Sequence, residues 1–138
     1  MGNLRYLLDT NVLSALMKEP TGALAQRIEQ LEGDEFCTSI IVACELRYGA
    51  AKKGSARLEA IVDQVLSQID VLPLDTESDR HYGELRWALE QEGKAIGPND
   101  LFIAAHARSL GVTLVTGNTR EFSRVPGLLV ENWLAPSG

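Results

Sequence analysis

Three carboxylates stand in segments of this chain that are otherwise apolar. Asp9 follows LRYLL, Glu45 interrupts SIIVACELRYGA, and Asp100 interrupts IGPNDLFIAAHA. A charge placed among core residues is unfavourable unless it is paired or holds a metal. Three such charges in one chain of 138 residues point to a common cause. The simplest cause is one acidic pocket that coordinates a hard divalent cation.

An all-oxygen set of ligands suits Mg²⁺ or Mn²⁺, which prefer oxygen and keep several waters. Structural zinc is not predicted, because no set of Cys and His has zinc spacing. A bound divalent cation lowers the pKa of water and stabilises the charge that builds on phosphate oxygens. Hydrolysis of a phosphodiester needs both and no covalent protein nucleophile. His81 and His106 are poor candidates for a general base, since each lies in a predicted helix with no motif around it.

The order of apolar segments predicts strands that alternate with helices. Strands are expected at 4–8, 35–39, 70–72, 112–115 and 128–133. Helices are expected at 11–18, 20–32, 40–53, 55–69, 76–92 and 99–110. This order predicts an α/β fold with a central parallel sheet flanked by helices on both faces. No linker or repeat divides the chain, so one domain is expected over 1–138, with 135–138 as a loose tail.

Asp9 comes directly after the first predicted strand. Ligands of open parallel sheets bind at the carboxyl ends of the strands, so this is a functional location by topology. The alternative is that Asp9 caps the helix beginning near Asn11, a role that is compatible with metal binding.

Glu45 lies in the middle of a predicted helix. It shares a face with Ile41 and Tyr48, which indicates partial burial. The alternative is an ion pair with Arg47 or Lys52, but neither stands at the helical spacing of three or four residues. Glu45 is therefore a candidate for the acidic pocket.

Asp100 and Asn118 have ordinary structural explanations when each is taken alone. Asp100 opens a helix, where the helix dipole favours an acid, and Asn118 in TGN fits a simple turn. The small residues after Asp100, such as Ala104, allow its helix to pack closely against the sheet. Asn118 follows the strand at 112–115, where its side chain could supply a carbonyl ligand or hold a water.

The net charge of −6 and the pI near 4.9 argue at first against a nucleic-acid partner. Metal binding by Asp9, Glu45 and Asp100 would offset half of this charge. Positive charge is also grouped locally, at Arg47, Lys52, Lys53, Arg57, Arg120 and Arg124, although solvated helix faces explain any single one of these.

The bulk composition fits a soluble globular protein, with 45% hydrophobic residues. No apolar run approaches the ~20 residues that cross a bilayer, and the N-terminus lacks the pattern of a signal peptide. Cys37 and Cys44 stand in apolar surroundings and are expected to be buried, reduced thiols. These features predict a cytoplasmic location without membrane attachment.

Three stretches of the chain stand out together. They are LLDTNVLSAL at 7–16, TSIIVACELRYGAAK at 38–52 and GPNDLFIAAHARSLGVTLVTGNTREFSRVPGLLVENW at 97–133. The DTN after the first strand, the helical E-x-x-x-G and the final D-x-x-I-A-A…T-x-N-x-x-x-F are specific in combination. They resemble the PIN-domain ribonucleases, and more narrowly the VapC toxins of bacterial toxin–antitoxin pairs.

The resemblance implies a Mg²⁺- or Mn²⁺-dependent endoribonuclease that leaves 5′-phosphate and 3′-hydroxyl ends. Asp9, Glu45 and Asp100 match the family's acidic metal-site positions. Asn118 matches a fourth position that is often Asp in PIN domains, and a neutral amide attracts a cation less than a carboxylate does. Thr116 matches a hydroxyl that lines the site, and Asn11 of the DTN motif is expected to line it as well.

The resemblance also implies partners. These are tRNA as substrate, a second copy of the toxin in a homodimer, and a VapB-like antitoxin that occludes the site in a hetero-oligomer. Promoter DNA would be contacted only through the antitoxin. An acidic site suits a basic antitoxin segment, whose Arg or Lys would reach Asp9 and Asp100 in place of the metal.

Three other classes of protein are alternatives to this hypothesis. A catalytically silent PIN-like module that binds RNA or protein is the alternative, and the acidic trio argues against it. A phospho-acceptor receiver needs adjacent acids early in the chain, whereas Asp9 has no acidic neighbour. Aspartyl-phosphate hydrolases use D-x-D, whereas this chain has Asp9-Thr10-Asn11.

Overall fold

The structure is a computed structural model that describes residues 3–134. Five short strands form one sheet in the order β3-β2-β1-β4-β5, and every neighbouring pair is parallel. The strands are β1 (Tyr6–Leu8), β2 (Phe36–Ser39), β3 (Asp70–Leu72), β4 (Thr113–Val115) and β5 (Val130–Glu131). The predicted parallel sheet is therefore confirmed.

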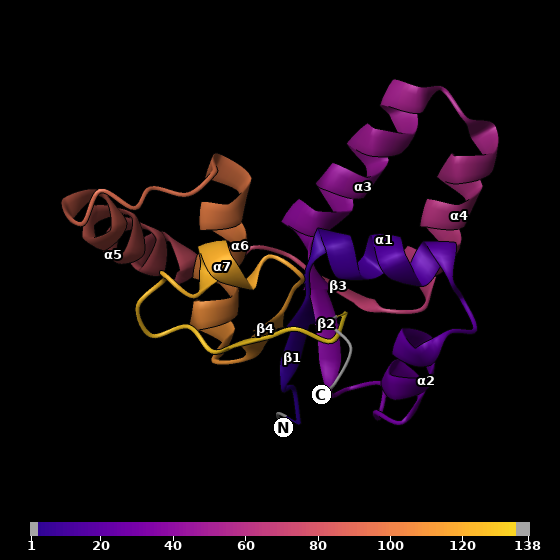
Figure 1. The fold of residues 1–138 in the computed structure, drawn as a ribbon, viewed down its shortest axis with the longest axis horizontal. Coiled ribbons are helices and arrows are strands. Elements are labelled where there is room, and N and C mark those ends of the chain that lie inside the picture. Colours follow the sequence, from indigo (N-terminus) through magenta and orange to yellow (C-terminus); the bar gives the residue numbers. More distant parts are fainter. Residues whose placement is uncertain (1–2, 135–138) are drawn as a thin grey trace.

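Helices connect the strands and cover both faces of the sheet. They are α1 (Thr10–Lys18), α2 (Ala23–Glu29), α3 (Ile40–Lys53), α4 (Ala56–Ser67), α5 (Ser78–Gln91), α6 (Pro98–Leu110) and α7 (Thr119–Phe122). The chain runs from β1 through β2 to β3 at one edge, then crosses back to β4 on the other side of β1. Because such crossovers are right-handed, α1–α4 and α5–α6 cover opposite faces. Figure 1 shows these two groups of helices on either side of the strands.

β1 and β4 lie side by side at the point where the strand order reverses. Leu8 pairs with Val115, and the next backbone N–H, that of Asp9, donates to the Val115 carbonyl over 2.9 Å. A crevice forms outside the carboxyl ends of strands at such a switch point, and this is where ligands of parallel sheets bind. The residues that follow β1 and β4 are therefore placed in a functional position by the topology.

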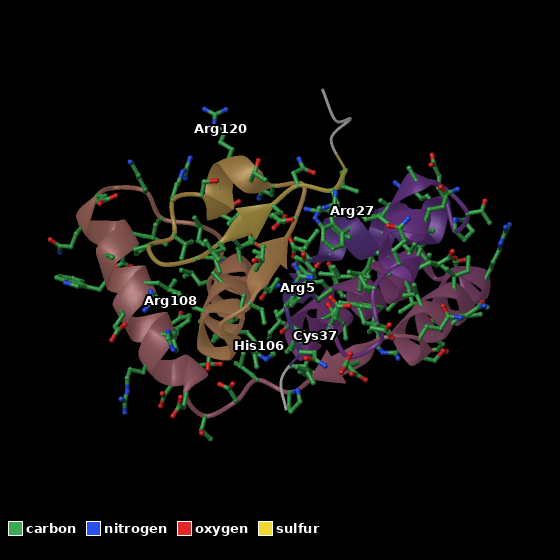
Figure 2. The ribbon with its side chains drawn as sticks, turned by 90° about the horizontal axis from the view of Figure 1, so that it is seen from below. Arg5, Arg27, Cys37, His106, Arg108 and Arg120 are labelled. Atoms are coloured by element: carbon green, nitrogen blue, oxygen red, sulfur yellow. The ribbon has the colours of Figure 1, made fainter. Side chains whose placement is uncertain are left out.

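The core explains why three-residue strands suffice for this sheet. Leu7, Leu8, Leu114 and Val115 are fully buried, as expected for central parallel strands covered on both faces. On the α5–α6 face, Arg108 of α6 lies beside α5 (Figure 2). It bonds there to Glu84 at 2.8 Å and to His81 at 3.1 Å, both on α5. This link ties the C-terminal end of α6 to α5.

Several predicted boundaries are exact and others are wrong. The helix at 40–53 and the strand at 70–72 match α3 and β3. α3 ends where predicted because Gly54 adopts a left-handed conformation, with φ at 60°. The predicted helix at 20–32 is shortened to Ala23–Glu29, because Gly22 is its N-cap residue and the helix does not begin at Pro20.

α7 was not predicted, because four residues show no periodic pattern. The strand expected at 128–133 forms a ladder only at Val130–Glu131. No helix within 3–134 is both long and apolar enough to cross a bilayer. The predicted loose tail, 135–138, lies outside the described residues. Cys37 and Cys44 are free thiols, but only Cys37 is buried as predicted, because Cys44 lies on an exposed part of α3.

Candidate active site

A cavity of about 480 Å³ opens at the carboxyl ends of β1 and β4. Residues from four separate parts of the chain line it, and these are Asp9, Thr10, Asn11, Ser14, Ala15, Lys18, Glu45, Asp100 and Asn118. Asp9 is the N-cap residue of α1, and five further lining residues lie along that helix as far as Lys18. Glu45 comes from α3, Asp100 from the first turn of α6, and Asn118 from the start of α7. The three carboxylates singled out from the sequence thus share one cavity.

Asp9 is the most deeply buried of the acids, at 3% exposure. Its Oδ1 accepts a hydrogen bond from the Thr10 backbone N–H at 2.8 Å, which caps α1. Its Oδ2 accepts one from Thr116 Oγ1, also at 2.8 Å. Burial raises the pKa of Asp9, the bonds from Thr116 and Thr10 oppose that rise, and the charge of Glu45 adds to it. Asp9 therefore caps α1 and lines the cavity at the same time.

Glu45 is half-buried and is held by polar neighbours rather than by a cation. Its Oε1 accepts a hydrogen bond from Thr10 Oγ1, and its Oε2 accepts one from Asn99 Nδ2 at 3.4 Å. Arg47, the alternative partner, pairs instead with Asp63 at 2.7 Å. Among residues 3–134 no salt bridge involves Glu45. The carboxylate is thus oriented into the cavity without its charge being neutralised.

Asp100 and Glu121 form a carboxyl pair at the rim of the cavity. Burial raises the pKa of Asp100 to about 7, with further contributions from the hydrogen bond and charge of Glu121, and then from Asp9 and Glu45. Glu121 is also partly buried, yet hydrogen bonds from the Gly97 backbone N–H at 3.1 Å and from Asn118 Nδ2 at 2.6 Å lower its pKa. Asp100 is therefore the member of the pair that carries a proton near neutral pH.

Glu121 is the site residue that the sequence reasoning missed. It stands three residues after Asn118, which is the N-cap residue of α7. This Asn-x-x-Glu spacing is that of a capping box, so the sequence gives it an ordinary structural explanation. The available signal was its place inside the T-x-N-x-x-x-F stretch, next to Asn118.

Asn118, Thr116 and Asn11 make a hydrogen-bonded layer beneath the acids. Thr116 is fully buried, and its Oγ1 accepts from the Asn118 backbone N–H at 3.0 Å while donating to Asp9. Asn11 lines the cavity, and its Oδ1 accepts from the Gly117 backbone N–H at 2.8 Å. Because the Asn118 amide nitrogen donates to Glu121, any ligand role of Asn118 falls to its carbonyl oxygen.

The residues of the cavity offer oxygen ligands with little opposing charge. Lys18 is the one cation among the lining residues. Within 3–134, no three His, Cys, Asp or Glu side chains are already gathered closely enough to hold a metal ion. The acids surround a wider space, which suits a hard cation that keeps part of its hydration shell. The pKa values of Asp9 and Asp100 are raised mainly by burial, and the charges of neighbouring acids add to the rise. Asp9, Glu45, Asp100 and Glu121 could hold such an ion.

Comparison with known proteins places this chain in a family. Residues 6–128 match the family model of the PIN domain. The tRNA(fMet)-specific endonuclease VapC of Shigella flexneri is 40% identical over 131 residues, which is 94% of this chain and 98% of that protein. Ribonuclease VapC2 of Haemophilus influenzae is 40% identical over 132 residues, covering 95% and 99% of the two chains.

A solved structure agrees with these sequence relationships. The crystal structure of VapBC2 from Rickettsia felis, bound to a DNA fragment from its promoter, includes a chain that superimposes with a TM-score of 0.88. Its sequence is 37% identical, and the match covers 94% of this chain and 99% of that one. The resemblance noted from the three sequence stretches is therefore confirmed: this chain belongs to the PIN domain family, among the VapC ribonucleases.

Proposed function

We propose that this chain is a metal-dependent endoribonuclease that serves as the toxin of a toxin–antitoxin pair. The observation that carries the proposal is the convergence of Asp9, Glu45 and Asp100 from three distant segments on one cavity. No salt bridge within 3–134 involves any of the three. Ionised acids that are held together without salt bridges repel one another, and a bound cation offsets that repulsion.

In this proposal Mg²⁺ or Mn²⁺ is the ion, with Asp9 and Asp100 as its most direct ligands. Glu45 completes the set or binds through water, and the Asn118 carbonyl oxygen positions the ion or a water. When bound, the cation activates water for attack on an RNA phosphodiester and stabilises the charge on the phosphate. Glu121 is an addition from the structure, since its carboxylate adjoins Asp100.

The remaining side chains orient these acids. Thr116 Oγ1 and the Thr10 N–H fix the two oxygens of Asp9, and Thr10 Oγ1 with Asn99 Nδ2 fixes those of Glu45. Because its pKa is about 7, Asp100 can hydrogen-bond to Glu121 in its protonated form, and it becomes a carboxylate ligand when the proton is released. Such neighbours keep ligand oxygens in position before the substrate arrives.

The partners follow from the relatives. One VapC relative is named as specific for tRNA(fMet), and we propose tRNA as the substrate of this chain too. The structural neighbours are VapBC complexes, so we propose a VapB-like antitoxin, toxin dimerisation and promoter DNA contact through the antitoxin alone. A basic antitoxin segment would suit the acidic cavity. We further propose that residues 1–138 act as one domain in the cytoplasm.

The test is cleavage of a tRNA(fMet) transcript in Mg²⁺, in Mn²⁺ and in EDTA. We expect wild type to cut only with metal, and Asp9→Asn and Asp100→Asn to lose activity by at least about 100-fold. Asp79→Asn is the matched control, because Asp79 is an exposed acid on α5 away from the cavity. Equal cleavage by all four proteins would refute the assignment.

Calorimetric titration with Mn²⁺ separates the proposal from its alternative. The endoribonuclease binds Mn²⁺, and Asp100→Asn weakens that binding. A wild-type protein that binds tRNA but neither Mn²⁺ nor Mg²⁺ would instead be a silent PIN-like binding module.

A further inference from the structure

A second cavity, of about 370 Å³, adjoins the acidic one and extends between α1 and α3. We call it the α1–α3 groove, and the residues that define it are Thr10, Ser14 and Lys18 of α1 and Glu45, Gly49 and Lys53 of α3. Four of these six also line the acidic cavity. The groove is therefore continuous with the candidate active site.

The two helices present matched stripes to this groove. Thr10, Ser14 and Lys18 are spaced four residues apart, and so are Glu45, Gly49 and Lys53. Side chains four residues apart lie on one helix face, and eight residues span about 12 Å along the axis. Thr10 and Glu45 are hydrogen-bonded to each other at the acidic end. Lys18 and Lys53 therefore stand at the ends of the stripes that are farther from the bond between Thr10 and Glu45.

The shape of the groove follows from how the helices diverge. Figure 1 shows α1 and α3 spreading apart from the ends of the strands, with α4 rising beside α3. Apolar side chains of α4, among them Leu58 and Ile61, form the remaining wall. Small residues line the middle, and a Cβ added at Gly49 would meet no atom within 4 Å. A chain backbone can therefore approach α3 closely.

The two lysines are not paired within the part of the chain that the structure describes. Both are exposed, and no salt bridge within 3–134 involves either of them. Lys52, by contrast, points to the Tyr48 ring, with 5.9 Å from Nζ to the ring centroid. Glu45 is the one acid among the groove residues, and it stands at the acidic end. The far end of the groove thus carries positive charge on a chain of net charge −6.

We propose that the α1–α3 groove holds the RNA strand adjacent to the cleaved bond, and that Lys18 and Lys53 bind its phosphates. The proposal rests on the proposed function and adds the path of the substrate. A phosphodiester that reaches the acids at Thr10 and Glu45 continues along the groove, so its neighbouring phosphates meet the two lysines. Lysine binds phosphate as a point charge, which positions a strand without reading its sequence.

The occupant is a single unpaired strand, because a cavity of this size does not admit a duplex. Riboses and bases would lie against the apolar wall of α4, and phosphates against the lysines. A basic antitoxin segment fits this groove less well than RNA does, because Lys18 and Lys53 would repel it.

The test is the salt dependence of RNA binding. A fluorescently labelled tRNA(fMet) transcript is titrated with Asp100→Asn protein, which does not cut it, from 50 to 200 mM KCl. Each phosphate contact on a single strand adds about 0.7 to the slope of log affinity against log salt. Adding Lys18→Gln or Lys53→Gln should lower that slope by about 0.7. The fourfold rise in salt then weakens binding about 2.6-fold less than in the parent protein.

Lys52→Gln is the matched control, because it removes the same charge one residue away and outside the groove. Its slope should equal that of the parent, and Lys18→Arg should restore the slope lost in Lys18→Gln. In the active protein, Lys53→Gln, which lies outside the acidic cavity, should raise KM and leave kcat at saturating tRNA unchanged. Unchanged slopes for both groove variants, or an equal loss in Lys52→Gln, would overturn the proposal.

The two proposals fail in different ways. If wild type does not cut RNA in any metal but the groove variants still lose slope, the groove stands as an RNA-binding surface and the nuclease assignment falls. If wild type cuts RNA and the groove variants match Lys52→Gln, the nuclease stands and the groove proposal falls. Groove variants that lose only binding to a co-expressed antitoxin would assign the groove to that partner instead.

Discussion

Thr116 Oγ1 donates a hydrogen bond of 2.8 Å to Asp9 Oδ2, joining two residues that are 107 positions apart in the chain. Each residue directly follows a central strand, Asp9 after β1 and Thr116 after β4. The bond therefore forms only because these strands pair in parallel with their carboxyl ends level. It fixes the orientation of the most deeply buried acid of the cavity, and it makes the sheet itself part of the site.

Replacing Thr116 with Val should lower the cleavage rate by about 10- to 100-fold, as is usual when a partner of a metal ligand is lost. Valine keeps the shape of the side chain but cannot donate to Asp9, so the Asp9 carboxylate loses its fixed orientation. Thr116→Ser keeps the hydroxyl and should retain most of the activity. The measurement is tRNA cleavage against Mg²⁺ concentration. Equal rates for Thr116→Val and wild type would show that the bond has no catalytic consequence.

Glu121→Gln should lower the pKa of Asp100 from about 7 toward its ordinary value. The variant removes the charge of Glu121, while burial and the charges of Asp9 and Glu45 keep part of the shift. NMR titration of the Asp100 carboxyl carbon in metal-free protein measures this directly. Glu59→Gln, a change on α4 outside the cavity lining, is the control. A pKa for Asp100 that does not move in Glu121→Gln would mean that the two carboxyl groups are not coupled.

The parallel sheet and three of the acids could be predicted from the sequence because they depend on patterns along the chain. Short apolar runs alternating with amphipathic segments fix the strand–helix order, and Asp9, Glu45 and Asp100 each break such a pattern. The positions of these acids beside one cavity follow from the topology, since β1 and β4 end at the switch point.

The remaining features depend on contacts that no local pattern records. Glu121 has the spacing of a helix cap, and only the fold shows that its carboxylate adjoins Asp100. Thr116 was expected to line the site, and its burial beneath Asp9 depends on the pairing of β1 with β4. The stripes of Thr10, Ser14 and Lys18 and of Glu45, Gly49 and Lys53 both have helical spacing in the sequence. Only the fold shows that the two stripes line one groove.

Asp100→Asn should stabilise the metal-free protein at pH 8 while abolishing activity. The folded-state pKa of Asp100, about 7, lies above its ordinary value of 3.8. Its favourable contribution to stability is therefore fully present below the ordinary value and is lost as the pH rises through about 7. At pH 8 the wild type holds this charge in a partly buried place beside Glu121, with Asp9 and Glu45 nearby, whereas asparagine carries no charge. We expect thermal unfolding to show a Tm about 3–6 °C higher for the variant.

Added Mg²⁺ provides the second half of this test. Saturating metal should raise the Tm of wild type at pH 8, because an ion that binds only the folded state stabilises it. The same addition should have a much smaller effect on Asp100→Asn. A wild-type protein at pH 8 that is as stable without metal as the variant would contradict the account of uncompensated charge.

His106 should make the protein less stable below about pH 6.5. The ring is fully buried on α6, its Nδ1 lies 2.8 Å from Ser39 Oγ, and its Nε2 has no hydrogen-bond partner in the described structure. Burial lowers its pKa, against smaller opposing effects of the Asp75 charge and the Pro73 carbonyl. A lowered pKa means that the unfolded chain takes up a proton first as the pH falls. Stability is therefore complete above the ordinary value of 6.5 and declines below it.

The measurement is the free energy of unfolding in urea between pH 5 and pH 8, in an Asp100→Asn background that removes the opposing titration of that acid. A single proton gives a slope of at most about 1.4 kcal/mol per pH unit. His106→Gln should remove this slope, since glutamine does not titrate, while His81→Gln should leave it in place. If His106→Gln keeps the full loss of stability below pH 6.5, another group is responsible and the buried ring is not the source of the acid sensitivity.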